Sequence, residues 1–132
     1  MPDAFTIVNL AAVDDVAPRF GFDDRWEARG AREPLEAERT GVMYFRLRPG
    51  KRSPFTHRHA EAEEIYVILG GSGRVKVGDE VVDVNPRDAI RVAPTTPRAF
   101  EAGPEGLEYI AVGAHHPGDG EAVEDRWTAE EA

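Results

Sequence analysis

The chain has 132 residues, which is enough for one domain with a hydrophobic core. Its formal net charge of −9 argues against nucleic acid and anionic membranes as partners, because both require a positively charged protein surface. No cysteine is present, so any metal site must use nitrogen and oxygen ligands. The lack of cysteine and of an N-terminal secretory signal favours a cytoplasmic location. No apolar run approaches the ~18 residues of a membrane helix.

The first forty residues carry weak signals. Residues 5–10 are rich in β-forming side chains and are predicted as a strand that pairs with a partner subunit or with its own sheet edge. Residues 11–40 lack a clear period and are predicted to form an irregular arm with one short helical turn. The aromatic residues Phe20, Phe22 and Trp26 of this arm either close over a pocket or fasten the arm to the domain.

From residue 41 onward, short β-rich runs alternate with turn residues. The runs 74–77 and 80–84 flank Gly78-Asp79, a two-residue signal that predicts a β-hairpin. Both faces of the run 64–69 are largely apolar, which predicts a central strand covered on both sides. The other predicted strands are 42–48, 89–93, 98–102 and 107–112. Short strands at this spacing predict an all-β sandwich or barrel.

Residues 50–71 carry the strongest chemical signal. His57 and His59 are one residue apart, so on an extended strand their side chains point to the same face and can share one metal ion. Glu64 has the wrong parity for one unbroken strand, so residues 60–63 are predicted to turn and return its carboxylate to the same interior. A carboxylate in an apolar strand needs a metal ion or an arginine as compensation. Two imidazoles and one carboxylate suit Fe, Mn, Ni, Cu or Zn.

The spacing His57-x-His59-x4-Glu64-x6-Gly71, preceded by Gly50, resembles the first motif of the cupin superfamily, with one extra residue before His57. Residues 93–102 resemble the second motif in a turn and a phenylalanine. Arg98 stands where the family has its last metal-ligating histidine. The resemblance covers residues 41–112. It implies a cupin-2-like jelly-roll barrel in one domain over residues 1–116, metal ligation by His57, His59 and Glu64, and a homodimer.

Cupin relatives include dioxygenases, isomerases, epimerases and decarboxylases, so the resemblance does not fix a reaction. If the chain is an enzyme, we expect a metal-dependent oxygenase or isomerase. We expect it to bind or act on a small, anionic molecule, with Arg98, Tyr66 and Phe100 at the ligand. Tyr66 is either a pocket wall or proton donor, or a core tyrosine with a satisfied hydroxyl.

Arg98 separates the functional hypotheses, because a guanidinium has no lone pair to offer a metal. In one hypothesis it forms an ion pair with Glu64 that replaces the metal, and the barrel is a metal-free, non-catalytic binding module. In another, it clamps an anionic substrate group beside a three-ligand metal. In a third, it extends out of the barrel mouth to a surface acid.

Residues 117–132 are acidic and poor in aliphatic side chains, so they are predicted as a mobile tail. Val123 and Trp127 are the tail residues with the potential to dock on the domain. His115 and His116 precede the tail and belong either to a solvated loop or to a site that a folded-back tail would complete.

Overall fold

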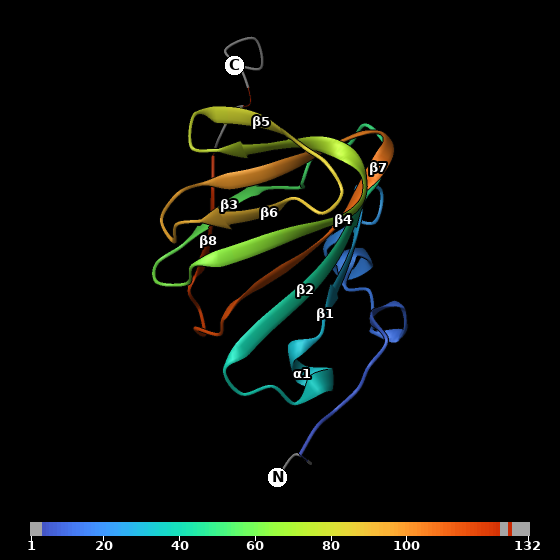
Figure 1. Cartoon of the computed structure of the whole chain (residues 1–132), viewed down its shortest axis with the longest axis vertical. Coiled ribbons are helices and arrows are strands. Elements are labelled where there is room, and N and C mark those ends of the chain that lie inside the picture. Colours follow the sequence, from blue (N-terminus) through green and yellow to red (C-terminus); the bar gives the residue numbers. More distant parts are fainter. Residues whose placement is uncertain (1–3, 125–126, 128–132) are drawn as a thin grey trace.

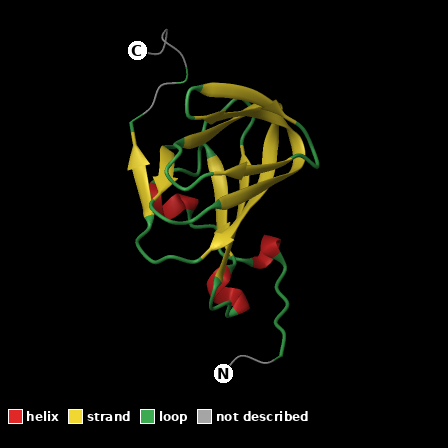
Figure 2. Cartoon of the chain, turned by 60° about the vertical axis from the view of Figure 1, so that its left-hand side comes forward, coloured by secondary structure: helices red, strands yellow, loops and turns green. Residues whose placement is uncertain are grey.

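The computed structural model describes residues 4–124 and Trp127. Curved strands make up most of the described chain and the helices are short turns (Figure 2). The turns are η1 (Leu10–Ala12), η2 (Ala17–Phe20) and α1 (Arg32–Leu35). The strands are β1 (Trp26–Gly30), β2 (Thr40–Leu47), β3 (Thr56–His59), β4 (Glu64–Val77), β5 (Glu80–Val84), β6 (Ala89–Val92), β7 (Arg98–Ala114) and β8 (Gly120–Val123). None of the helices in this described part is long and apolar enough to cross a membrane.

The strands form an all-β jelly-roll barrel, as predicted, in which β4 and β7 each run through both walls (Figure 1). In one wall, the first half of β4 pairs with β6 and with the second half of β7, which pairs in turn with β2 and β1. In the other wall, the second half of β4 pairs with β5 and with the first half of β7, next to β3 and β8. All of these pairs are antiparallel, and the predicted hairpin at Gly78-Asp79 joins β4 to β5.

Glycines let β4 and β7 cross together from one wall to the other. The register shifts twice between Ile68 and Gly73. Gly71 has φ +78°, and a Cβ atom at this position would overlap the backbone oxygen of Gly106. Only glycine permits this backbone angle and this close approach together. The predicted strands 98–102 and 107–112 are therefore the two halves of the single bent strand β7.

Aromatic rings fill the space between the walls. The rings of Phe100 and Tyr109 stack with centroids 4.2 Å apart, and Tyr66 meets Phe100 at 5.0 Å. Phe45 stacks on Tyr109 at 5.2 Å and contacts Trp26 at 4.6 Å. Each fully buried ring contributes roughly 1.5–3 kcal/mol through apolar burial. This cluster fixes the spacing of the walls and forms a firm base for the cavity described below.

Two predictions for the N-terminal region are wrong. Residues 5–10 form no strand, and Phe5 and Ile7 are exposed. The arm is also less irregular than predicted, because it contains β1, which pairs with β2 along its whole length. The carboxylate of Asp15 accepts hydrogen bonds from the backbone N–H groups of Ala17 and Ala28, so the preceding segment is fastened to β1. β1 thus covers a sheet edge, which was one of the two roles considered for residues 5–10.

Part of the predicted mobile tail belongs to the barrel. β8 pairs with β3 and covers an edge that would otherwise be open. Trp127, one of the two tail residues named as able to dock, does so: its side chain is buried, and the guanidinium carbons of Arg52 and Arg74 lie 4.8 and 5.6 Å from its ring centroid. The rest of the predicted tail, residues 125–126 and 128–132, lies outside the described residues.

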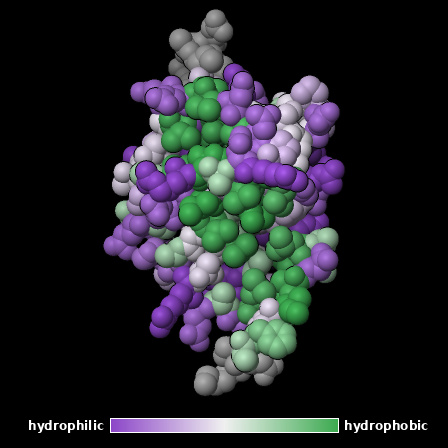
Figure 3. Space-filling view, viewed as in Figure 1, coloured by the Kyte–Doolittle hydropathy of each residue, from purple (hydrophilic) through white to green (hydrophobic). Residues whose placement is uncertain are grey.

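The outer face of β4 is more exposed than predicted. Ile65 and Leu69 are 43% and 46% exposed, so the strand is not covered on both sides within one chain. Figure 3 shows apolar surface gathered near the middle of the face seen in Figure 1, over the region of β2, β4 and β6. Alternating apolar side chains therefore line both the interior and this outer face.

Candidate metal centre

The predicted metal ligands converge inside the barrel. β3 carries His57 and His59, whose Nε2 atoms lie 3.4 and 3.1 Å from Oε1 of Glu64 at the start of β4. One ligand atom from each residue lies within 4.8 Å of the others. The turn predicted between the histidines and Glu64 is present at residues 60–63. The parity argument is therefore confirmed.

The histidines fit a metal by their hydrogen bonding as well as by their position. Both ring nitrogens of His59 are buried, and neither has a hydrogen-bond partner among the described residues. Buried ring nitrogens are normally satisfied, so an unsatisfied Nε2 that faces a second imidazole and a carboxylate is suited to a cation. The rings of His57 and His59 meet edge to face with centroids 5.3 Å apart.

Glu64 is held ionised in this position. Its Oε1 atom accepts a 2.6 Å hydrogen bond from the hydroxyl of Tyr66. Burial alone raises the pKa of Glu64, but its hydrogen bonds with His57 and Tyr66 and its electrostatic attraction to the two imidazoles outweigh burial and lower the pKa to about 2. Burial and the charge of Glu64 raise the pKa of Tyr66 well above its usual value. At neutral pH, a carboxylate anion and a neutral phenol therefore stand side by side.

Asp119 stands behind His59, and the sequence arguments missed it. Its Oδ2 atom lies 3.3 Å from Nδ1 of His59, and its side chain is 6% exposed. The carboxylate accepts hydrogen bonds from the backbone N–H groups of Ala60, Glu61 and Ala62 at 2.9–3.0 Å. Burial acts to raise the pKa of Asp119, but these donors and His59 have the larger, opposite effect, so the pKa lies below its usual value. A carboxylate behind Nδ1 favours a proton there, which leaves Nε2 free for a metal.

Arg98 is completely buried, with 0% exposure, so the hypothesis that it extends to a surface acid is wrong. Its Nη2 atom donates to the carbonyl oxygen of Ala93 at 2.9 Å, and its Nη1 atom lies 3.8 Å from Oε1 of Glu64. Within the described chain, Nε and Nη1 have no hydrogen-bond partner. Arg98 thus forms a long ion pair with Glu64. Its position on β7 pairs with His57 on β3.

A cavity of about 390 Å³ leads from these groups toward the N-terminal arm. His57, His59, Glu64 and Tyr66 lie at its polar end. Aromatic rings dominate the remaining wall, which includes Phe20, Phe22, Trp26, Phe45 and Phe55. The arm aromatics therefore wall a pocket, and the contacts of Trp26 with Phe45 and Phe55 also fasten the arm to the domain, so the structure supports both roles considered for them.

Two residues expected at the ligand lie one layer behind this wall. Arg98 and Phe100 are not among the described residues that line the cavity, and Phe100 packs on Tyr66 and Tyr109 instead. Phe55 lines the cavity but was not predicted. Its position two residues before His57, on the same side of an extended chain, is the signal that would have identified it.

Comparisons with known proteins agree with this fold. A cupin protein from Bacteroides fragilis is 21% identical, with a TM-score of 0.70 over 95% of this chain and 92% of its own. The polyketide cyclase RemF from Streptomyces resistomycificus is also 21% identical, with a TM-score of 0.74 over 92% and 87%. A sugar phosphate isomerase from Silicibacter pomeroyi is 16% identical, with a TM-score of 0.69 over 85% and 77%.

At these identities the structural neighbours establish the fold alone. A search of curated proteins finds no match. The cupin domain family matches residues 43–113, which is more than half of the chain and includes the three predicted metal ligands. The chain is therefore a member of the cupin family.

Proposed function

We propose that the chain binds a divalent metal ion through His57, His59 and Glu64 and uses it to bind or transform a small organic molecule. The observation that carries the proposal is the convergence of these side chains at one end of a cavity, with Nε2 of His59 buried and unsatisfied. The donor set suits Fe, Mn, Ni, Cu or Zn. A metal in this position supplies Lewis acidity to a ligand in the cavity.

The wall of the cavity supports a ligand with an apolar or aromatic body. Rings such as Trp26, Phe45 and Phe55 offer stacking and edge contacts, whereas a highly hydroxylated molecule would leave its polar groups unpaired there. Tyr66 keeps its proton and donates to Glu64, so it positions that carboxylate. An oxygenase or isomerase activity stays a prediction, as do the cytoplasmic location and the exclusion of nucleic acid and membranes as partners.

The second candidate is a metal-free binding module in which Arg98 neutralises Glu64. The observation that favours it is the 3.8 Å approach of a fully buried guanidinium to the carboxylate that the metal would need. A buried charge of either sign requires compensation, and here each side chain supplies part of it for the other. In this candidate, the two histidines complete the polar end of the cavity without a metal.

We also propose that the chain forms a homodimer through the outer face of the wall that contains β2, β4 and β6. Ile65 and Leu69 project from β4 onto this face, where Figure 3 shows contiguous apolar surface. A second copy of the same face would bury these side chains by a two-fold contact. An Ile65→Glu/Leu69→Glu variant should shift the mass measured by light scattering from dimer to monomer. A monomeric parent chain would exclude the dimer.

Metal content decides between the two candidates. We expect near-stoichiometric metal by mass spectrometry in the parent purified without chelator, and little in a His57→Ala/His59→Ala variant. The control is His116→Ala, because His116 is an exposed histidine outside the cavity. No metal in the parent, even after soaking in Fe(II), Mn(II), Ni(II) and Zn(II), would exclude the metal site and leave the Glu64–Arg98 module.

A further inference from the structure

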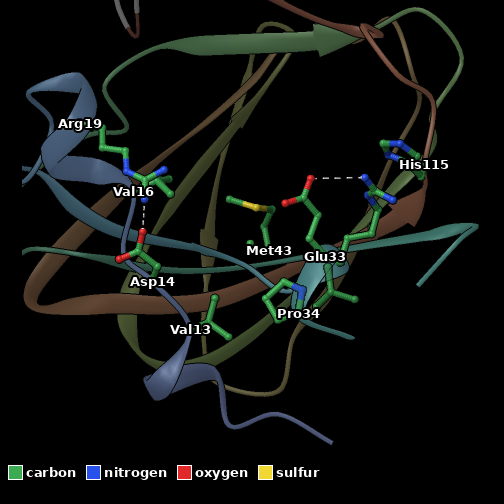
Figure 4. A pocket seen from close by; sticks show the side chains of 12 residues that line it. Val13, Asp14, Val16, Arg19, Glu33, Pro34, Met43 and His115 are labelled. Atoms are coloured by element: carbon green, nitrogen blue, oxygen red, sulfur yellow. Dashed lines mark hydrogen bonds and ion pairs between the residues drawn. The ribbon is translucent and has the colours of Figure 1, made fainter. Parts of the chain in front are cut away.

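A second cavity, of about 520 Å³, lies between the N-terminal arm, α1 and the beginning of β2. We call it the outer cavity, and the aromatic cavity at the metal ligands the inner cavity. Figure 4 shows Met43 in the middle of the outer cavity, between the Arg19–Asp14 ion pair on one side and Glu33, Pro34 and His115 on the other. Unlike the inner cavity, its wall carries cationic side chains.

Two side chains separate the cavities. Val16 and Met43 line both of them. Met43 has an unbranched, flexible side chain, so a ligand can displace it at low cost. Its sulfur atom lies 3.0 Å from the place where a Cβ atom on residue 30 would be, so Gly30 provides the space in which this side chain rests. The two cavities are therefore separated by the flexible side chain of Met43 and by Val16.

Arg32 is the cation of the outer cavity best placed to receive an anion. Its Nη1 atom donates to the carbonyl oxygen of Ala37 at 3.2 Å, which holds the guanidinium in place. Its acidic neighbour Glu33 is 3.9 Å away and 87% exposed, whereas the Arg32 side chain is 32% exposed. Such a long, exposed ion pair contributes little, so a ligand anion can replace it. His115 lines the same cavity.

We propose that the two cavities form one bipartite site for an elongated ligand. Its apolar head lies in the inner cavity, and its anionic group, such as a carboxylate, lies in the outer cavity against Arg32 and His115. This deepens the proposed function, because the head is the part that would meet the metal. It also places anion recognition on Arg32, since Arg98 is buried behind the inner wall.

The test uses ω-phenylalkanoic acids, from phenylacetate to 8-phenyloctanoate, and their primary amides, titrated into the metal-loaded chain by calorimetry. Beyond a threshold chain length, we expect the acid to bind roughly tenfold more tightly than the amide of equal length. Arg32→Gln should abolish this difference between acid and amide. Arg46→Gln is the control, because Arg46 is an exposed arginine on β2 outside both cavities. Met43→Trp should weaken the binding of the long acids and leave the binding of the short acids unchanged.

Three results would overturn the proposal: an acid preference equal in Arg32→Gln and the parent, an acid preference already complete for phenylacetate, or no binding by the whole series. Repeating the titrations after metal removal separates the proposal from the metal site. A preference that depends on Arg32 and persists without metal supports the bipartite site even if the metal proposal fails. If the chain binds stoichiometric metal but its preference for the acid does not depend on Arg32, the bipartite site is excluded and the metal proposal stands.

Discussion

Replacing Asp119 by asparagine tests whether the residue behind His59 prepares the metal site. Oδ1 of Asp119 accepts the N–H groups of Ala60 and Glu61, while Oδ2 accepts that of Ala62 and lies 3.3 Å from Nδ1 of His59. An asparagine that keeps its oxygen in the Oδ1 position retains two of the three backbone bonds. Its NH₂ group then replaces Oδ2 and faces Nδ1 of His59.

An NH₂ donor reverses the tautomer of the imidazole. Nδ1 must offer its lone pair to the amide, so the proton of neutral His59 moves to Nε2, the atom that the metal needs. We therefore expect Asp119→Asn to lower metal affinity roughly 10- to 100-fold, as is typical when a partner of a metal-ligating histidine is lost. The affinity is measured by competition with a chromophoric chelator.

The metal-free protein gives an independent measurement. Long-range ¹H–¹⁵N NMR spectra of the imidazole should show the proton of His59 on Nδ1 in the parent and on Nε2 in Asp119→Asn. Glu121→Gln is the control, because Glu121 is an exposed carboxylate on β8 that pairs with Arg58. The reasoning is refuted if Asp119→Asn keeps the parental tautomer and binds metal with parental affinity.

Three further predictions concern stability. Trp127→Ala should lower the free energy of unfolding in urea by about 2 kcal/mol, because the ring is buried beneath two guanidinium groups; an unchanged midpoint would contradict this. Gly71→Ala should cost more than about 3 kcal/mol, whereas Gly50→Ala, with a similar positive φ but open space, should cost about 1 kcal/mol; equal costs would refute the overlap argument. Burial raises the pKa of Glu101 but its two arginine partners lower it further, so Glu101→Gln should be less stable than the parent at pH 7. This difference in unfolding free energy, measured in urea, should shrink as the pH falls below about 4.3 and disappear once the pH passes the folded-state pKa of Glu101. A difference that does not change with pH would contradict stabilisation by the two arginines.

The sequence predicted those parts of the site that depend on local geometry. The parity of His57 and His59 requires only an extended strand, and the return of Glu64 requires only a turn between them, so both follow from spacing. The hairpin at Gly78-Asp79 is equally local.

The parts that the sequence did not predict depend on pairing between distant segments. β1 and β8 are short, and they are strands because β2 and β3 offer them open edges. Asp119 is an unremarkable acid in an acidic segment until β8 brings it to His59. The burial of Arg98 likewise follows from β7 crossing the barrel, since a single arginine in a strand has no pattern that distinguishes inside from outside.

The charges around the proposed metal also bear on the ligand. A divalent ion and the buried Arg98 together bring three positive charges, whereas Glu64 and Asp119 supply two negative charges. The neutral aromatic wall of the inner cavity cannot balance the remainder, and charges interact strongly where water is excluded. The metal-loaded site therefore favours a ligand whose head is apolar along the aromatic wall and places one electron-rich atom at the polar end of the inner cavity. The metal-free Glu64–Arg98 module has no such excess of positive charge at its polar end and would favour a head without that atom.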